Sequence, residues 1–178
     1  MNICVFCSSS NRVADEFKQL GNEIGRKIAK LGHTLVYGGA TGGLMDSIAE
    51  GATEQKGKII GVIPEIIIKS NRANNLSTEV IITADMQERK KRMKEIADVF
   101  LVLPGGYGTL DEMFDVIASG SVGEHKKPLF VLNYNGFFNK LIDFSVQLKR
   151  DAFTPYEEMY KPEFINTVDE VLQKLAVR

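Results

Sequence analysis

Residues 104–112 read Pro104-Gly105-Gly106-Tyr107-Gly108-Thr109-Leu110-Asp111-Glu112, and they follow the apolar run 99–103. Large apolar residues at helical spacing come directly afterwards, at 113–117. An apolar run, a glycine-rich turn and then helical spacing predict a strand, a loop and a helix in that order. We therefore expect this loop to connect a buried strand to the first turn of a helix.

The three glycines of this loop favour an anion-binding site. Without Cβ atoms their backbone N–H groups can point into one concavity, beside the unpaired donors and the positive dipole end of the next helix. Thr109 and Glu112 have the spacing of a capping box, with Thr109 as the N-cap. Thr167 and Glu170 repeat that spacing, so the box alone indicates only a helix start. The glycines before Thr109 favour a ligand-binding loop over a merely tight turn.

Composition limits the class of protein. The 178 residues are 44% hydrophobic and 25% charged, which predicts a single globular domain over 1–178. A net charge of -1 gives no general attraction to nucleic acid, and no apolar run is long enough to span a membrane. The sequence begins without a basic leader, so we expect a cytoplasmic protein. Cys4 and Cys7 are too far apart on a strand to form a disulfide, and no metal-ligand spacing occurs.

Strand and helix patterns alternate along the chain. This alternation predicts an α/β fold: a Rossmann-like, doubly wound and mainly parallel sheet with helices on both faces. Residues 65–77 suggest a short helix and an excursion loop. We expect strands at 3–7, 35–37, 58–63, 79–83, 98–103 and 129–132, and helices at 13–31, 44–55, 84–97, 109–119, 136–149 and 166–176.

A second glycine-rich loop, residues 38–43, follows the second expected strand. It would face the same rim of the sheet as the loop at 104–112. Ala40 occupies the middle position of a dinucleotide fingerprint and no Walker lysine follows, so a P-loop is excluded and NAD binding is a weak option. The alternative is a tight turn that lets helix and sheet approach closely.

The expected helix 84–97 carries cations on its apolar stripe. At 100° per residue Arg89 and Lys90 share a face with Met86 and Met93. Cations on a buried face need anionic partners. One alternative is an internal salt bridge to Glu112 or Asp111, and the other is a substrate phosphate or a leaving group.

Several motifs together resemble the Lonely Guy (LOG) family of cytokinin riboside 5'-monophosphate phosphoribohydrolases, from Ile3 to about Phe144. The most specific part is the pairing of an Arg-Lys helix with Pro-Gly-Gly-x-Gly-Thr-x-x-Glu. The motifs are Met86-Gln87-Glu88-Arg89-Lys90, the stretch 104–112, Val36-Tyr37-Gly38-Gly39 with Gly43-Leu44-Met45, and Ile60-Gly61-Val62-Ile63-Pro64.

The resemblance implies a Rossmann-like homodimer that hydrolyses the N-glycosidic bond of N6-modified adenosine 5'-monophosphate, giving free base and ribose 5-phosphate. It implies catalytic roles for Arg89 and Glu112, and no cofactor. Substrate contacts are expected from Lys90, Gly105, Gly106, Tyr107, Gly108, Thr109, Leu110, Asp111, Gly38, Gly39 and Met86. Proteins with this motif have also been labelled lysine decarboxylases, but nothing in the sequence resembles a pyridoxal phosphate site.

The chain departs from the family pattern at four positions. The family commonly has His at Gln87, Gly at Ser8 and Asp46, and Thr at Ala118. The differences at Asp46 and Ala118 leave the base preference and the pocket shape open. Glu112 and Arg89 suit the cleavage of an N-glycosidic bond. A carboxylate can stabilise the oxocarbenium-like transition state or activate water, while a cation positions the nucleotide. A non-catalytic nucleotide-binding or sensor protein with the same loop is the alternative.

Overall fold

A computed structural model describes residues 1–154 and 160–176 of the chain. The predicted strands and helices are all present, with their ends shifted by at most three residues, and a short strand and a 3-10 turn are added. The elements are β1 (Asn2–Phe6), α1 (Asp15–Lys30), β2 (Thr34–Tyr37), α2 (Gly43–Glu54), β3 (Ile59–Pro64), α3 (Glu65–Lys69), β4 (Glu79–Thr83), α4 (Met86–Ile96), β5 (Val99–Val102), α5 (Tyr107–Ser121), β6 (Leu129–Leu132), η1 (Tyr134–Gly136), α6 (Asn139–Arg150), β7 (Glu163–Ile165) and α7 (Val168–Ala176).

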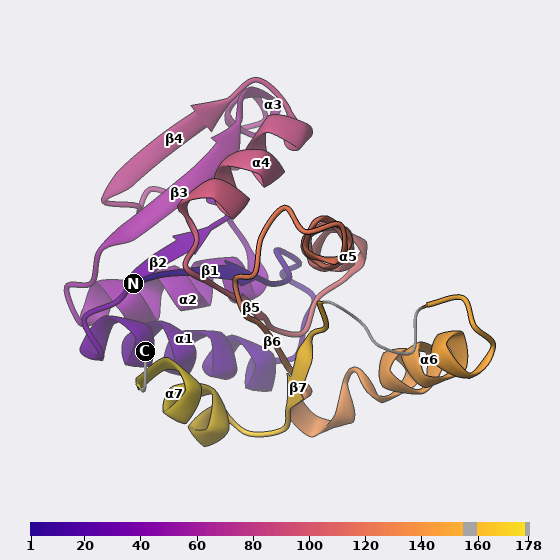
Figure 1. Cartoon of the computed structure of the whole chain (residues 1–178). Coiled ribbons are helices and arrows are strands. Elements are labelled where there is room, and N and C mark those ends of the chain that lie inside the picture. Colours follow the sequence, from indigo (N-terminus) through magenta and orange to yellow (C-terminus); the bar gives the residue numbers. More distant parts are fainter. Residues whose placement is uncertain (155–159, 177–178) are drawn as a thin grey trace.

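The strands form one sheet in the order β4-β3-β2-β1-β5-β6-β7 (Figure 1). Every adjacent pair is parallel, which confirms the predicted α/β, doubly wound fold. The chain starts at β1 and moves to β4 on one side, and then it crosses back to β5 on the other. The direction therefore reverses between β1 and β5, and in such sheets ligands bind beside that reversal, at the carboxyl ends of the strands.

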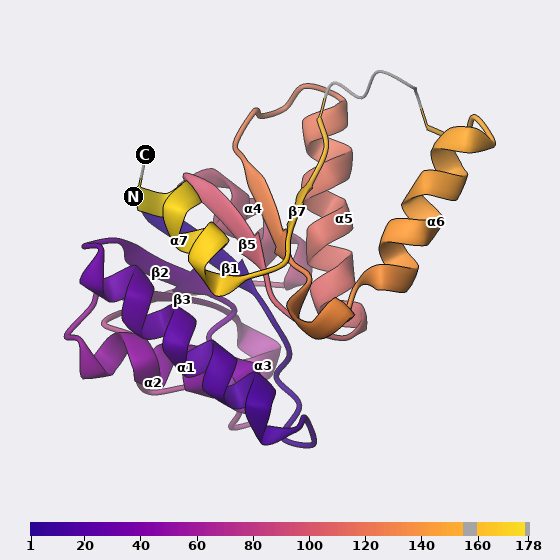
Figure 2. The same ribbon diagram turned by 90° about the horizontal axis from the view of Figure 1, so that it is seen from below.

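Helices cover both faces of the sheet (Figures 1 and 2). Apolar stripes of α1, α2 and α7 pack on one face, where Ile24, Ile48 and Val171 are fully buried. The other face is covered by α4 and α5, through Met93 and Met113 among others. Each central strand is buried on both sides, which is why these strands appear in the sequence as continuous apolar runs.

Helix α6 differs from the others, because none of its residues is buried. Figure 2 shows it beside α5 and away from the sheet. The pattern at 136–149 correctly predicts a helix here, although the 3-10 turn η1 precedes it in the chain and α6 begins only at Asn139. An amphipathic pattern therefore fixed the helix without fixing a burial site for its apolar side.

Strand β7 (Glu163–Ile165), at the edge of the sheet, is not predicted by the sequence pattern. Three residues are too few to show an alternating pattern, and β7 exists because it pairs with β6. Cys4 and Cys7 are free and buried, as expected. No helix in the described ranges is long and apolar enough to cross a membrane. The single domain over 1–178 stays a prediction, since 155–159 and 177–178 lie outside those ranges.

Candidate active site

A pocket of about 430 Å³ lies at the carboxyl edge of the sheet, beside the reversal between β1 and β5. Its volume is in the range of small-ligand sites. The loops after β1, β2, β3 and β5 all contribute to it, so both glycine-rich loops reach one pocket. Its walls consist of Cys7, Ser8, Ser9, Ser10, Ala40, Met45, Ile67, Arg72, Met86, Arg89, Gly106, Gly108, Thr109 and Glu112.

A buried ion pair forms part of the pocket wall. The Nη2 of Arg89, on α4, donates to the Oε1 of Glu112, on α5, and the two residues are only 6% and 3% exposed. The Arg89 Nη1 donates to the Met86 Sδ at 3.6 Å, whereas its Nε is buried without a partner in the described structure. Oε2 of Glu112 accepts no hydrogen bond from the described residues. The Glu112 carboxylate, which lines the pocket, therefore keeps one oxygen without a partner among the described residues.

The start of α4 is fixed locally, and this places Arg89. The Asp85 carboxylate accepts the N–H groups of Gln87 and Glu88, and Glu88 accepts the N–H of Ala84 at 2.7 Å. This arrangement resembles a capping box, except that Glu88 accepts the N–H of Ala84 and not that of the N-cap residue Asp85. Because α4 begins there, Arg89 lies one turn in and faces the sheet, as its stripe predicts.

Burial governs the electrostatics of the ion pair. Desolvation raises the pKa of the Glu112 carboxyl above its ordinary value, and the Arg89 guanidinium opposes this rise. Gly38 leaves room for the guanidinium, because a Cβ at this position would lie 3.0 Å from the Arg89 Nη2. The pair therefore holds a carboxylate of raised pKa next to a fixed cation, as in many acid–base sites.

The predicted capping box at Thr109 and Glu112 is wrong. Helix α5 begins at Tyr107 with Gly106 as its N-cap, and no side chain caps this end. Thr109 lies inside the first turn, 3% exposed and packed against Gly105, while Glu112 turns to Arg89 instead of back to the helix start. The first N–H groups of α5 therefore have no side-chain cap, and Gly106 and Gly108 place this end of the helix at the pocket wall.

The matching sequence at Thr167 and Glu170 does form a capping box. The Thr167 Oγ1 accepts the Glu170 N–H at 3.2 Å, and the Glu170 carboxylate accepts the N–H groups of Asn166 and Thr167. Glu170 is exposed and has no part in the pocket. The same sequence spacing therefore gives a cap in one place and a buried ion pair in the other.

The remaining predicted site residues lie outside the pocket wall. Lys90 pairs with the exposed Asp111 through Nζ–O distances of 3.0 and 3.1 Å, so both internal salt bridges that the sequence suggested are present. Tyr107 is 93% exposed. The structure brings Met86, Arg89, Gly106, Gly108, Thr109 and Glu112 into the pocket, and leaves Lys90, Gly105, Tyr107, Leu110, Asp111, Gly38 and Gly39 out of its wall.

Sequence reasoning missed several pocket residues. Ser8, Ser9 and Ser10 follow β1, and their place at the carboxyl end of a central strand was a usable signal. Arg72 comes from the loop after α3, where no local pattern indicates which way a side chain turns. Its position depends on contacts with distant residues.

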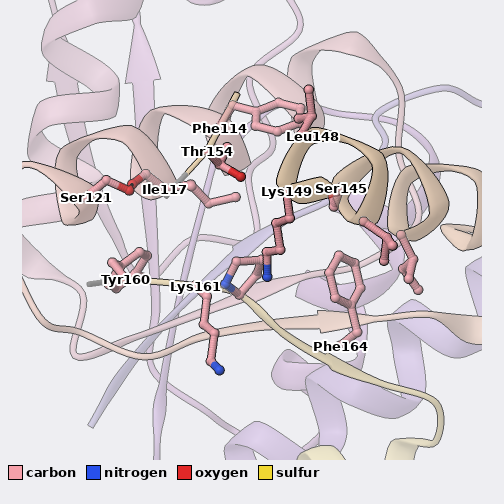
Figure 3. Close-up of a pocket in the computed structure, with 13 residues that line it drawn as sticks. Phe114, Ile117, Ser121, Ser145, Leu148, Lys149, Thr154, Tyr160, Lys161 and Phe164 are labelled. Atoms are coloured by element: carbon pink, nitrogen blue, oxygen red, sulfur yellow. The ribbon is translucent and has the colours of Figure 1, made fainter. Parts of the chain in front are cut away.

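A second pocket, of about 280 Å³, lies between α5, α6 and the chain before β7 (Figure 3). Phe114 and Ile117 of α5, Leu148 of α6 and Phe164 of β7 line it. Its wall has no carboxylate and no buried ion pair among the described residues, so it lacks the chemistry of the first pocket.

Comparisons with known proteins place this chain in a family. Residues 45–175 match a family model described as "Possible lysine decarboxylase". The cytokinin riboside 5'-monophosphate phosphoribohydrolase LOG5 of Arabidopsis thaliana is 34% identical over 173 residues, which are 97% of this chain and 76% of that protein. This chain belongs to the LOG family.

Two further comparisons describe the relationship. LOG7 of Arabidopsis thaliana, also a cytokinin riboside 5'-monophosphate phosphoribohydrolase, is 33% identical over 192 residues, and the match covers 98% of this chain and 87% of LOG7. The molybdenum cofactor binding protein of Rippkaea orientalis shares the fold, with a TM-score of 0.74 and 18% identity, and covers 99% of this LOG-family chain and 95% of its own. The second likeness concerns the fold alone.

Proposed function

We propose that this LOG-family protein hydrolyses the N-glycosidic bond of an adenosine 5'-monophosphate, with or without an N6 substituent, to free base and ribose 5-phosphate. The observation that carries this proposal is the buried pair of Arg89 and Glu112 in the wall of a pocket that also contains the uncapped start of α5. The names of the relatives support the same reaction.

The geometry suggests how the reaction proceeds. The bond between C1' and the base nitrogen breaks, a water oxygen bonds to C1', and a proton from that water goes to the departing base. In its ionised form Glu112 stabilises positive charge at C1', accepts through Oε2 the one proton that the attacking water loses, and passes that proton to the departing base. Arg89 holds the carboxylate in place through its Nη2.

The 5'-phosphate is assigned to the N–H groups at the start of α5, in the nest of Gly105 to Thr109. Binding energy from this remote group orients the sugar over Glu112. The structure pairs Lys90 with Asp111 outside the pocket wall, so a contact of Lys90 with substrate requires that this pair opens. The role that we propose for Gly38 is to leave space for the Arg89 side chain, and not to contact the substrate.

Incubation of the purified protein with AMP, adenosine and N6-isopentenyl-AMP, followed by chromatography for free base, tests the proposal. Base should be released from the monophosphates, and far more slowly from adenosine. Tight AMP binding without base release would instead support the non-catalytic nucleotide-binding protein. Equal turnover of AMP and adenosine would remove the nest from the mechanism.

Glu112→Gln tests the catalytic carboxylate. We expect turnover to fall by about 10²-fold or more, as for other lost electrostatic stabilisers. Glu170→Gln is the matched control, because its carboxylate caps α7 away from the pocket. Comparable base release by Glu112→Gln and wild type would refute the assignment.

A homodimer in the cytoplasm is also proposed for this protein. Sedimentation at micromolar concentration should then give about twice the chain mass. A monomer that is fully active would show that the pocket of one chain is sufficient.

A further inference from the structure

The segment after α3 is attached to the glycine-rich loop after β2 and contributes Arg72 to the wall of the candidate active site. The Thr41 N–H donates to the Arg72 carbonyl at 2.7 Å, and the Asn74 N–H donates to the Gly39 carbonyl at 2.8 Å. Ala40 and Ala73 form an antiparallel bridge between these two bonds. The backbone on both sides of the Arg72 side chain is therefore fixed to the glycine-rich loop after β2.

A buried side-chain network strengthens this attachment. The Asp46 carboxylate accepts the Gly42 N–H and the Asn74 Nδ2–H, each at 2.7 Å. The Asn74 Oδ1 accepts the Leu76 N–H at 2.7 Å, and Asn74 is only 7% exposed. Asp46 of α2 thus holds the segment that carries Arg72, which is a specific function for a carboxylate at this position.

The Arg72 guanidinium reaches the pocket without an ionic partner. It lines the pocket and donates to the Ser9 Oγ at 3.4 Å, and no carboxylate among the described residues pairs with it. The Oγ atoms of Ser8 and Ser10 also accept hydrogen bonds, from the N–H groups of Ser10 and Arg12. A hydroxyl that accepts still has a proton to donate. Arg72 and the three serine hydroxyls can therefore donate hydrogen bonds to a ligand in the pocket.

The charges of the pocket wall favour an anion. Its charged residues are two cations, Arg72 and Arg89, and one carboxylate, Glu112. Since Arg89 is paired with Glu112, the free positive charge belongs to Arg72. The uncapped start of α5 adds the positive end of a helix dipole to the same pocket.

We propose that Arg72 binds the phosphoryl group of the nucleotide, together with the serine hydroxyls and opposite the N–H groups of α5, and that Asp46 and Asn74 are positioning residues for it. The inference rests on the proposed nucleotide substrate. A phosphate has three terminal oxygens, so the helix start and a guanidinium can bind different oxygens at once.

Calorimetric titration with AMP and with adenosine tests the inference without relying on turnover. Arg72→Gln should raise the Kd for AMP by about 10- to 100-fold, the range of a charge-assisted hydrogen bond, and leave adenosine binding unchanged. Arg72→Lys should recover part of the affinity, since it restores the charge but not the bidentate geometry. Lys69→Gln is the control: it removes a nearby cation that pairs with Glu65 outside the pocket, and should have no effect.

The positioning role has its own readout. Asn74→Ala should weaken AMP binding when Arg72 is present, and should add little in the Arg72→Gln background, because the two changes remove one interaction. Full additivity of the two changes would show that Asn74 acts separately from Arg72.

The outcomes separate this inference from the proposed function. If AMP affinity depends on Arg72 and no base is released, the reaction is wrong and the phosphate contact stands. If base release requires the phosphate while Arg72→Gln binds AMP like wild type, the contact is wrong and the reaction stands. An equal loss for adenosine and AMP, or no AMP binding by wild type, would also overturn the contact.

Discussion

Replacing Arg89 by Met isolates the electrostatics of the buried ion pair. Met has similar bulk and no charge, so the variant leaves the Glu112 carboxylate 3% exposed and without its cation. A buried carboxylate that loses its partner is costly, and it can avoid most of that cost by taking up a proton. The variant should therefore be less stable than wild type, by an amount that depends on pH.

The loss of folding stability in Arg89→Met has an upper limit. Burial already raises the Glu112 pKa in the wild type, where Arg89 opposes the rise, so Arg89→Met raises it further. Holding the carboxyl protonated at pH 7, against its ordinary value of 4.5, costs about 3.4 kcal/mol at 1.36 kcal/mol per pH unit. The folded-state pKa lies above the unfolded one in both proteins, so the charge-related deficit of the variant relative to wild type begins above the raised wild-type pKa and grows as pH rises.

Denaturant unfolding of wild type and variant between pH 4.5 and 7 measures this deficit. We expect it to increase with pH and to stay below the upper limit of about 3.4 kcal/mol at pH 7, with a slope of up to about 1.4 kcal/mol per pH unit. Arg89→Met combined with Glu112→Gln should lose the slope, because Gln cannot ionise. Arg92→Met is the matched control on α4: its pair with Glu95 is exposed, so the loss should stay within about 0.5 kcal/mol.

A deficit that is the same at pH 4.5 and pH 7 would refute this reasoning, since only packing would then be lost. A pH slope in Arg92→Met of the same size would refute it too. If Glu112 must be ionised for catalysis, the activity of the wild type should decline as pH falls through the Glu112 pKa. Because burial raises this pKa, the decline should begin at a pH above 4.5.

Three further predictions concern other parts of the molecule. Gly105→Ala places a Cβ against the Thr109 side chain and should destabilise the fold by about 1–3 kcal/mol in denaturant unfolding. Burial raises the pKa of the Cys4 and Cys7 thiols, so a thiol reagent at pH 8 should modify them only after denaturation, and rapid modification in the folded protein would contradict their burial. Burial lowers the pKa of His125 below 6.5, so stability should fall as pH drops through 6.5, and His125→Gln should lose that dependence; an NMR titration of the ring at or above 6.5 would count against it.

The sequence by itself determined the elements of the fold and much of the candidate site. Alternating apolar runs and helical stripes need only local periodicity, so they predicted the parallel sheet and the helix that turns Arg89 and Lys90 inward. The requirement that a buried cation finds an anion was enough to name Glu112 and Asp111 as partners. The glycine-rich loops were correctly expected at one rim, because parallel strands end at one edge.

Only the tertiary structure decided which of several locally allowed contacts formed. Thr109 and Glu112 have the spacing of a capping box, but a glycine at the N-cap and a guanidinium 23 positions away gave Glu112 a different partner. The residues of β7 became a strand by pairing with β6. Arg72 faces the pocket because bonds to Thr41 and, through Asn74, to Asp46 hold its segment there. Local sequence sets which conformations are available, whereas contacts between residues distant in the chain select among them, because their energies exist only once the sheet has formed.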